Sequence, residues 1–308
     1  MPSPQMYVQL VSEGQQGDFH MIFPYDGIAE ADGSSQFTTL QAADDALDSA
    51  AYSLYVKTGT FAAGLTVSTD NVYIFVEPGT VIQGAITLSG DNIMLILGAG
   101  CDVQALITLS GANCSLICQN GVDIDGISAT GNFYLIDGGG WETLVDGGTT
   151  RIAIDLTGTD GLIKDIACQT TAGQGNAFYG LSWTGANTRI VRVRVVDADD
   201  RSITGSGADN LIEGCEVLGS DDRGIFCSGP RTRIVGNYII ATGGDGIQMG
   251  GNGDDSTIIG NVVKDATGDS IGITANAENC VVVGNRLDGA VNDASGTSTV
   301  ASNDTTAF

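Results

Sequence analysis

The chain has 308 residues, 45 of them glycine, and a formal net charge of −25 at neutral pH. Nucleic acids and anionic membrane surfaces attract basic proteins, so this charge excludes both as partners. The sequence contains no run of about 18 apolar residues, and we therefore expect no membrane-spanning helix.

The first 35 residues show no periodicity, and we interpret them as an N-terminal arm, a candidate attachment segment. Met1–Met21 lacks a basic stretch followed by an apolar one, so no secretory signal is expected there. His20, the single histidine of the chain, falls in this arm, and we interpret it as structural or incidental.

Residues 36–61 predict a short capping helix followed by the first strand. One threonine of the Thr38–Thr39 pair suits the N-cap position, and Leu40, Ala43 and Leu47 fall on one helical face. Such a helix would cover the end of a β-sheet core, which otherwise exposes an unpaired strand edge.

A short phrase repeats along residues 62–291: two apolar residues one apart, a small polar turn, then a second strand-like run. The repeats are Leu65-x-Val67, Ile86-x-Leu88, Ile107-x-Leu109, Ile127, Ile154-x-Leu156, Leu181-x-Trp183, Ile203, Ile225-x-Cys227, Ile247-x-Met249 and Ile271-x-Ile273. A spacing of roughly 20 to 27 residues is typical of a solenoid, in which each repeat packs on the next. Three short strands per repeat predict an all-β fold, a parallel β-helix solenoid of about ten coils.

Three asparagines, Asn237, Asn261 and Asn285, share one register in consecutive repeats, and we expect them to hydrogen-bond to one another inside the coil. Trp183 falls on an inward position and is expected in the core. The seven cysteines form no CxxC pair, so buried, reduced thiols and a reducing folding compartment are expected. Residues 292–308 are interpreted as a fading final coil or a flexible tail.

The FTTLQAA…YVKTGTF segment, the Ser-Gly-x-Asn turns and the Gly-Asn register resemble the right-handed parallel β-helix (pectin-lyase-like) superfamily over residues 36–295. The resemblance implies a right-handed solenoid. That superfamily includes polysaccharide lyases, polygalacturonases, epimerases and phage tailspikes, so the resemblance implies a carbohydrate as the first substrate class to consider. Fold alone does not fix function.

Two residues before each apolar pair stand side chains that stacking would bring into one outward column. They are Asp125, Ile152, Tyr179, Arg201, Arg223, Asp245 and Asp269, and the residues one position earlier include Phe178, Asp200 and Asp222. Stacked carboxylates raise one another's pKa unless arginines compensate, and an acid of raised pKa beside an ionised one is what glycoside hydrolysis requires.

This column supplies most of the candidate site residues. The candidate catalytic residues are Asp200, Asp222, Arg223 and Asp245. The candidate substrate-binding residues are Trp141, Phe178, Tyr179, Arg201 and Asp269, of which Trp141 comes from a longer loop of the kind that carries specificity.

A plainer interpretation of the same column stays open: Asp and Arg alternating on adjacent coils form a surface salt-bridge ladder of little energetic weight. The Gly-His-Gly motif of polygalacturonase-like hydrolases is absent, and lyases of the superfamily pair basic residues with Ca²⁺-binding acids. Gly251–Asp255 resembles a Ca²⁺ loop in composition but lacks the spacing of an EF-hand or a nonapeptide repeat. No cofactor is predicted, with Ca²⁺ as the alternative.

Two functional hypotheses follow. The first is a virion-associated structural β-helix protein of the tailspike, appendage or decoration type, which mediates assembly or attachment to a host-surface glycan. It would form a homotrimer, contact other virion proteins through the N-terminal arm, and be assembled in the host cytoplasm. The second is a polysaccharide lyase or glycoside hydrolase, located outside the cell, that acts on a surface polysaccharide through the Asp/Arg column.

Overall fold

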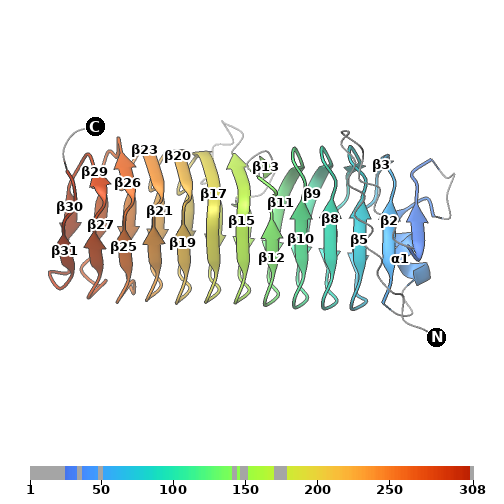
Figure 1. The fold of residues 1–308 in the computed structure, drawn as a ribbon, viewed down its shortest axis with the longest axis horizontal. Helices are drawn as coiled ribbons and strands as arrows, with labels where there is room; N and C mark the ends of the chain where they lie inside the picture. Colours follow the sequence, from blue (N-terminus) through green and yellow to red (C-terminus); the bar gives the residue numbers. More distant parts are fainter. Residues whose placement is uncertain are drawn as a thin grey trace, which may run out of the picture.

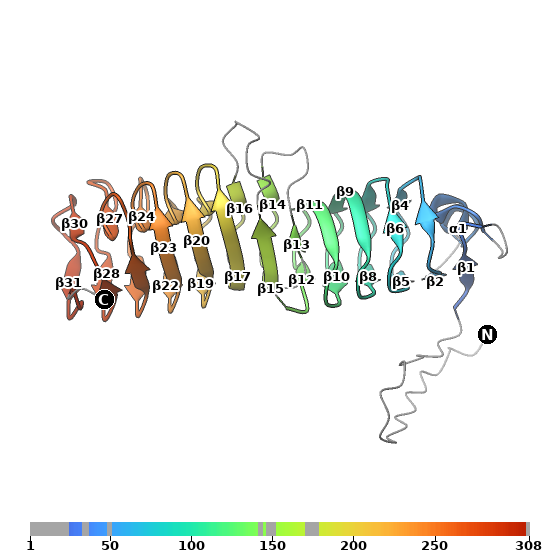
Figure 2. The same cartoon turned by 90° about the horizontal axis from the view of Figure 1, so that it is seen from above.

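The computed structural model describes residues 25–32, 37–47, 51–140, 144–145, 152–169 and 179–305. Their strands stack into a straight rod whose coils follow one another in sequence order from one end to the other (Figures 1 and 2). Neighbouring strands pair in parallel, each with its equivalent in the preceding and following coil.

Three sheets run along the rod. Sheet A contains β4 (Leu65–Val67), β7 (Ile86–Leu88), the end of β9 (Asp102–Leu109), the end of β11 (Asp123–Ala129), β14 (Ile152–Leu156), β16 (Tyr179–Trp183), β18 (Ile203–Gly205), β21 (Ile225–Cys227), β24 (Ile247–Met249), β27 (Ile271–Ile273) and β30 (Val291–Asp293).

Sheet B follows sheet A in each coil. It contains β1 (Gly27–Ala29), β2 (Ser53–Val56), β5 (Tyr73–Val76), β8 (Met94–Leu97), β10 (Ser115–Cys118), β12 (Leu135–Asp137), the start of β15 (Leu162–Gln169), the start of β17 (Arg189–Ala198), β19 (Leu211–Glu213), β22 (Arg233–Val235), β25 (Thr257–Ile259), β28 (Val281–Val283) and β31 (Thr299–Ala301).

Sheet C completes the coil. It contains β3 (Thr60–Phe61), β6 (Val81–Ile82), the starts of β9 and β11, β13 (Leu144–Val145), the ends of β15 and β17, β20 (Glu216–Ser220), β23 (Tyr238–Thr242), β26 (Val262–Lys264) and β29 (Arg286–Leu287).

The predicted parallel β-helix of about ten coils is confirmed, and the repeated phrase forms sheet A. Both apolar residues of a phrase point inward and are buried, as Ile86 and Leu88 are over Ile107 and Leu109. The residue between them points outward. The phrase therefore marks the part of each coil that contributes most regularly to the core.

The corners between sheets A and B depend on residues that tolerate a positive φ. Asparagine or aspartate holds this conformation in most coils, with φ near 60° at Asn71, Asn92 and Asp209. Asparagine and aspartate adopt the left-handed region with little steric strain. Their side chains also hydrogen-bond to the neighbouring coil, as Asn92 Nδ2 does to Asn71 Oδ1 at 3.2 Å. The turn chemistry read from the sequence thus sets where each sheet ends.

Inside the rod, the asparagine register forms a hydrogen-bonded ladder. Asn237 Nδ2 donates to Asn261 Oδ1 at 2.9 Å, and Asn261 Nδ2 donates to Asn285 Oδ1 at 3.0 Å. Asn303 continues the ladder, and the backbone N–H of Cys215 donates to Asn237 Oδ1 at its other end. The predicted structural role of this column is confirmed.

Two buried aromatic rings lie over glycines of the following coil. The Trp183 ring packs against Gly205, and the Tyr134 ring packs against Gly161, where a side chain would collide with it. Trp183 is fully buried, as predicted. All seven cysteines are buried and unpaired, and burial raises the pKa of the Cys215 thiol to about 12, which makes it unreactive.

The helix α1 (Leu40–Leu47) lies at the N-terminal end of the rod (Figure 1). The backbone N–H of Ala42 donates to Thr39 Oγ1 at 3.1 Å, which identifies Thr39 as the N-cap. Leu40 and Ala43 are buried in the same core as the first coils, so the helix covers their end. It is the single helix of the described ranges, and at eight residues it is too short to cross a bilayer.

Replacing Asn261 by alanine should lower the free energy of unfolding by about 2–4 kcal/mol, because Asn237 loses its acceptor and buried N–H groups remain unpaired. Urea and thermal unfolding followed by circular dichroism measure this. Asn252→Ala, in an exposed turn, is the control and should change stability by less than about 0.5 kcal/mol. Equal effects of the two variants would contradict a supporting role for the ladder.

Candidate functional site

The outward residues of sheet A form a polar strip along the rod. Listed along the rod, they are Thr66, Thr87, Thr108, Ser128, Asp155, Ser182, Thr204, Phe226, Gln248, Gly272 and Asn292. Hydroxyl groups predominate in the first half, and a charged cluster lies beside the second half. This cluster, defined as Asp200, Arg201, Asp222, Arg223 and Phe226, is called the Arg–Phe cluster below.

An aspartate lies between the two arginines of the Arg–Phe cluster. Arg223 Nη1 donates to Asp222 Oδ2 at 2.7 Å, and Arg201 Nε donates to the same oxygen at 3.3 Å. Arg201 also lies 3.8 Å from Asp200 Oδ1. The backbone N–H of Asp222 donates to the carbonyl oxygen of Asp200 at 3.1 Å, so the two carboxylates occupy consecutive coils as predicted.

Both guanidinium groups lie close to the ring of Phe226. Arg201 Cζ is 4.5 Å and Arg223 Cζ is 5.3 Å from the ring centroid, within the range of cation–π contacts. The ring packs against Gly250, where a Cβ atom would lie 2.6 Å from it. A half-exposed aromatic ring is therefore held in place beside two cations on the outer surface of sheet A.

The column continues through Asp245 and Asp269, whose carboxylate oxygens accept hydrogen bonds from other residues of the chain. Asp245 Oδ1 accepts from the backbone N–H of Asp269 at 2.9 Å, and its Oδ2 accepts from Gln248 Nε2 at 2.7 Å. Asp269 Oδ2 accepts from Asn292 Nδ2 at 2.9 Å. These carboxylates position the turns and the outward amides around them.

Tyr179 is half-exposed at the start of β16 and lies in the same column as Arg201, one coil earlier. The structure therefore brings Tyr179, Arg201, Arg223, Asp245 and Asp269 onto one edge of sheet A. The other two predicted binding residues, Trp141 and Phe178, lie outside the described residues.

Sequence reasoning missed Phe226, Gln248 and Asp155, which all stand between the two apolar positions of a phrase. The phrase itself contained the signal, because a residue flanked by two inward ones must point outward. Phe226 and Gln248 then become neighbours of the predicted column.

Asp155 is a half-buried carboxylate on the outer face of sheet A, in register with Ser128 and Ser182. Burial raises the pKa of Asp155 above its ordinary value. A carboxyl group of raised pKa on a polar surface is the type of group that serves as a general acid.

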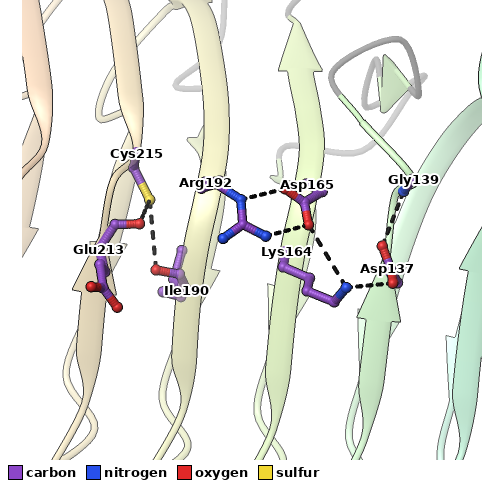
Figure 3. Close-up of polar contacts among 8 residues, drawn as sticks. All are labelled: Asp137, Gly139, Lys164, Asp165, Ile190, Arg192, Glu213 and Cys215. Atoms are coloured by element: carbon purple, nitrogen blue, oxygen red, sulfur yellow. Dashed lines mark hydrogen bonds and ion pairs between the residues drawn. The ribbon is translucent and has the colours of Figure 1, made fainter.

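Ion-pair ladders also occur away from sheet A, where they provide a comparison. Lys164 Nζ lies 2.6 Å from Asp137 and 3.7 Å from Asp165, and Arg192 makes two 2.6 Å hydrogen bonds to Asp165 (Figure 3). These guanidinium contacts lower the pKa of Asp165. No aromatic ring contact accompanies this ladder among the described residues, so the Arg–Phe cluster differs from it in composition.

Within the described ranges, no group of three or more His, Cys, Asp or Glu side chains is arranged to hold a metal ion. In the loop with calcium-like composition, Asp254 Oδ1 accepts from the backbone N–H of Glu278 at 2.8 Å, and Asp255 Oδ1 accepts from Asn279 Nδ2 at 3.4 Å. These aspartates are thus engaged in bonds to the next coil.

The sequence matches a known protein family. Residues 151–305 match the family described as right handed beta helix region, and this match covers half of the chain. This chain belongs to the right-handed β-helix family. The resemblance inferred from the turns and the asparagine register is confirmed. A comparison with curated proteins found no significant sequence match.

Several solved structures share the fold at low sequence identity. The Dettilon tailspike protein has a TM-score of 0.61 at 16% identity, over 86% of this chain and 66% of the tailspike chain. A mutant of the periplasmic alginate epimerase AlgG has a TM-score of 0.53 at 13% identity, over 82% and 77% of the two chains. The A-module of the mannuronan C-5 epimerase AlgE6 from Azotobacter vinelandii has a TM-score of 0.51 at 12% identity, over 87% and 94%. The chain spans just under two thirds of the tailspike, and these similarities show the fold alone.

Replacing Asp155 by asparagine should stabilise the protein at pH 7, by at most about 1 kcal/mol because the side chain is only half-buried. The sign follows from the raised pKa: the stability associated with protonated Asp155 is present at low pH and is lost as pH rises through the folded-state pKa. Urea unfolding at pH 3 to 8 should therefore show a difference that disappears in acid. Asp221→Asn, on an exposed residue, is the control, and equal behaviour of the two variants would contradict the burial of Asp155.

Proposed function

We propose that this protein is a virion-associated β-helix protein of the tailspike or appendage type that binds a host-surface polysaccharide through sheet A. The fold shared with the Dettilon tailspike supports the class. The observation that carries the proposal is the Arg–Phe cluster, an aromatic ring with two guanidinium groups on an otherwise hydroxyl-rich strip.

The chemistry of this surface suits a sugar chain. An aromatic face packs against the apolar C–H face of a pyranose ring, while guanidinium groups donate paired hydrogen bonds to hydroxyl or carboxylate oxygens. Tyr179 and Asp269 extend the surface in opposite directions along the rod, and the threonines of β4, β7 and β9 add hydroxyl groups at one per coil. A linear glycan lying along the rod would meet all of these groups in sequence.

The proposed function also includes attachment of the protein to the virion and association of its copies. Residues 1–35 would attach the protein to other virion proteins, and three copies would associate into a homotrimer. Trp141 and Phe178 stay proposed glycan contacts, because each belongs to a longer segment that precedes a strand of sheet A. The virion is the proposed location, and no cofactor is proposed.

The alternative function is a polysaccharide lyase or glycoside hydrolase, located outside the cell. Asp200, Asp222, Arg223 and Asp245 were the predicted catalytic group, but Asp222 Oδ2 and both Asp245 oxygens are already engaged within the chain. Asp155, with its raised pKa, is the stronger candidate for a general acid.

Phe226→Ala should weaken binding to a recognised polysaccharide at least about tenfold, which corresponds to about 1.4 kcal/mol. Arg223→Gln should have a similar effect, because it removes a charged donor and one contact to the ring. A panel of acidic and neutral polysaccharides, tested by calorimetry and by adsorption to host cells, identifies the ligand and measures the loss.

Arg231→Ala provides a matched control, since Arg231 is an exposed, ion-paired arginine at the corner between sheets A and B. It should bind as the unaltered protein does. No binding to any member of the panel would overturn glycan attachment through sheet A.

The enzyme alternative is tested on the same panel by measuring reducing ends and unsaturated products. Depolymerisation that is lost in Asp155→Asn, with binding retained, would establish catalysis at that residue. If the polysaccharide is still intact after prolonged incubation, the enzyme alternative is excluded and glycan attachment remains as the function of this surface.

A further inference from the structure

We infer that the outer face of sheet B is the surface through which copies of this chain associate side by side, with their rods parallel. The inference deepens the homotrimer of the proposed function, because it names the surface and the direction of association. It rests on the side chains of sheet B, and it does not depend on glycan binding through sheet A.

Fifteen of the 24 side chains on the outer face of sheet B are apolar or aromatic, and each of the five consecutive coils from β12 to β22 carries one charged side chain. Its first column contains Ser53, Tyr73, Met94, Ser115, Leu135, Leu162, Arg189, Leu211, Arg233, Thr257, Val281 and Thr299. Its second column contains Tyr55, Phe75, Ile96, Ile117, Asp137, Lys164, Val191, Glu213, Val235, Ile259, Val283 and Ala301. The outer face of sheet A, by contrast, consists mainly of hydroxyl, amide and acidic groups.

Several of these apolar side chains are open to solvent. Tyr73 is 55% exposed, Ile259 38% and Val281 37%, and most of the others are partly exposed. Twelve strands at about 4.8 Å spacing, each about 10 Å wide, give a face of roughly 600 Å². An exposed face with a majority of apolar side chains marks an interaction surface, and the area of the whole face approaches the roughly 800 Å² per partner of a standard interface.

The length of the face favours a second copy as the occupant. Sheet B runs straight from β2 to β31 (Figure 1), and no helix of the described residues covers its outer face. A single partner that covers the full length of this face must be equally long and must carry a matching apolar face. Another copy of this chain meets both requirements.

Five charged side chains lie on the face, and two of them, Asp137 and Lys164, form an ion pair with each other. The other three determine the direction of association. Arg189 and Arg233 belong to the first column, and Glu213 belongs to the second, in the coil between theirs. All three are exposed, and none has an ion-pair partner in the described part of the chain. Figure 3 shows Arg192 hydrogen-bonded to Asp165.

A rotation about an axis parallel to the rod brings the first column of one copy against the second column of the next, at equal height. Glu213 then faces the position between Arg189 and Arg233 of the neighbouring copy, and its offset from each along the rod is one strand spacing of about 4.8 Å. An antiparallel arrangement brings each column against itself, and when it is centred on the coil of Glu213, Arg189 faces Arg233. Electrostatic complementarity therefore favours the parallel arrangement.

Light scattering on the full chain tests the inference at micromolar concentration. The unaltered protein should have a mass above the 31.5 kDa of one chain. The double variant Ile117→Lys/Leu162→Lys should elute as a monomer, because two buried charges would oppose each contact. Thr87→Lys/Thr108→Lys, at outward positions of sheet A, is the matched control and should keep the mass of the unaltered protein.

A charge exchange tests the direction and does not depend on altering the apolar residues. Glu213→Arg should weaken association at least about tenfold, and so should Arg189→Glu/Arg233→Glu. Combining all three changes should restore association, since the pairs re-form with opposite sign. An antiparallel contact would give no such rescue, so its absence overturns the parallel arrangement.

The outcomes separate this inference from the proposed function. A monomeric unaltered protein, or unchanged association of the Ile117→Lys/Leu162→Lys variant, overturns the role of sheet B. A parallel dimer supports the role of sheet B in this inference, and of the proposed function it contradicts only the trimeric state. Glycan binding retained by a monomeric variant would leave the function of sheet A intact, and circular dichroism confirms that each variant is folded.

Discussion

Parallel hydrogen bonding between successive coils is the constraint on which the rest of this protein depends. Each strand finds its partners one coil before and one coil after it, at a fixed register. A side chain is therefore always next to the equivalent side chain of two other coils, about 4.8 Å away. Every column along the rod must consist of side chains that tolerate such close repetition.

The columns meet this requirement in different ways. Inward columns stack aliphatic residues, as Ile225 stacks on Ile247. Where a polar group is buried, it becomes one member of a ladder, and Asn261 both donates to and accepts from its neighbours. In outward columns, arginines separate the acidic side chains and pair with them, as Arg201 and Arg223 form ion pairs with Asp222. The same rule that stabilises the rod thus produces the charged cluster beside sheet A.

The three sheets expose different chemistry because their outward side chains do not pack in the core, so their residue types can differ from sheet to sheet. Sheet A carries hydroxyl groups and one aromatic ring with two guanidinium groups, which suits a hydrated ligand such as a glycan. Sheet B carries an outer face on which most side chains are apolar, which suits another protein surface. A straight rod separates these two faces by its own thickness, so both can be occupied at once (Figure 2).

The sequence by itself determined the coil period, the inward residues of sheet A, the asparagine ladder and the burial of Trp183. These depend on local patterns, namely the alternation of apolar residues and turn residues that accept a positive φ. The apolar face of sheet B was not predicted, because runs such as Tyr73–Val76 are apolar at every position and do not reveal which residues point outward. The Arg–Phe cluster was predicted only in part. Its contacts between coils join residues 21 to 25 positions apart, namely Arg201 with Asp222 and Arg201 with Phe226, and only the stacking of coils decides which of these outward side chains meet.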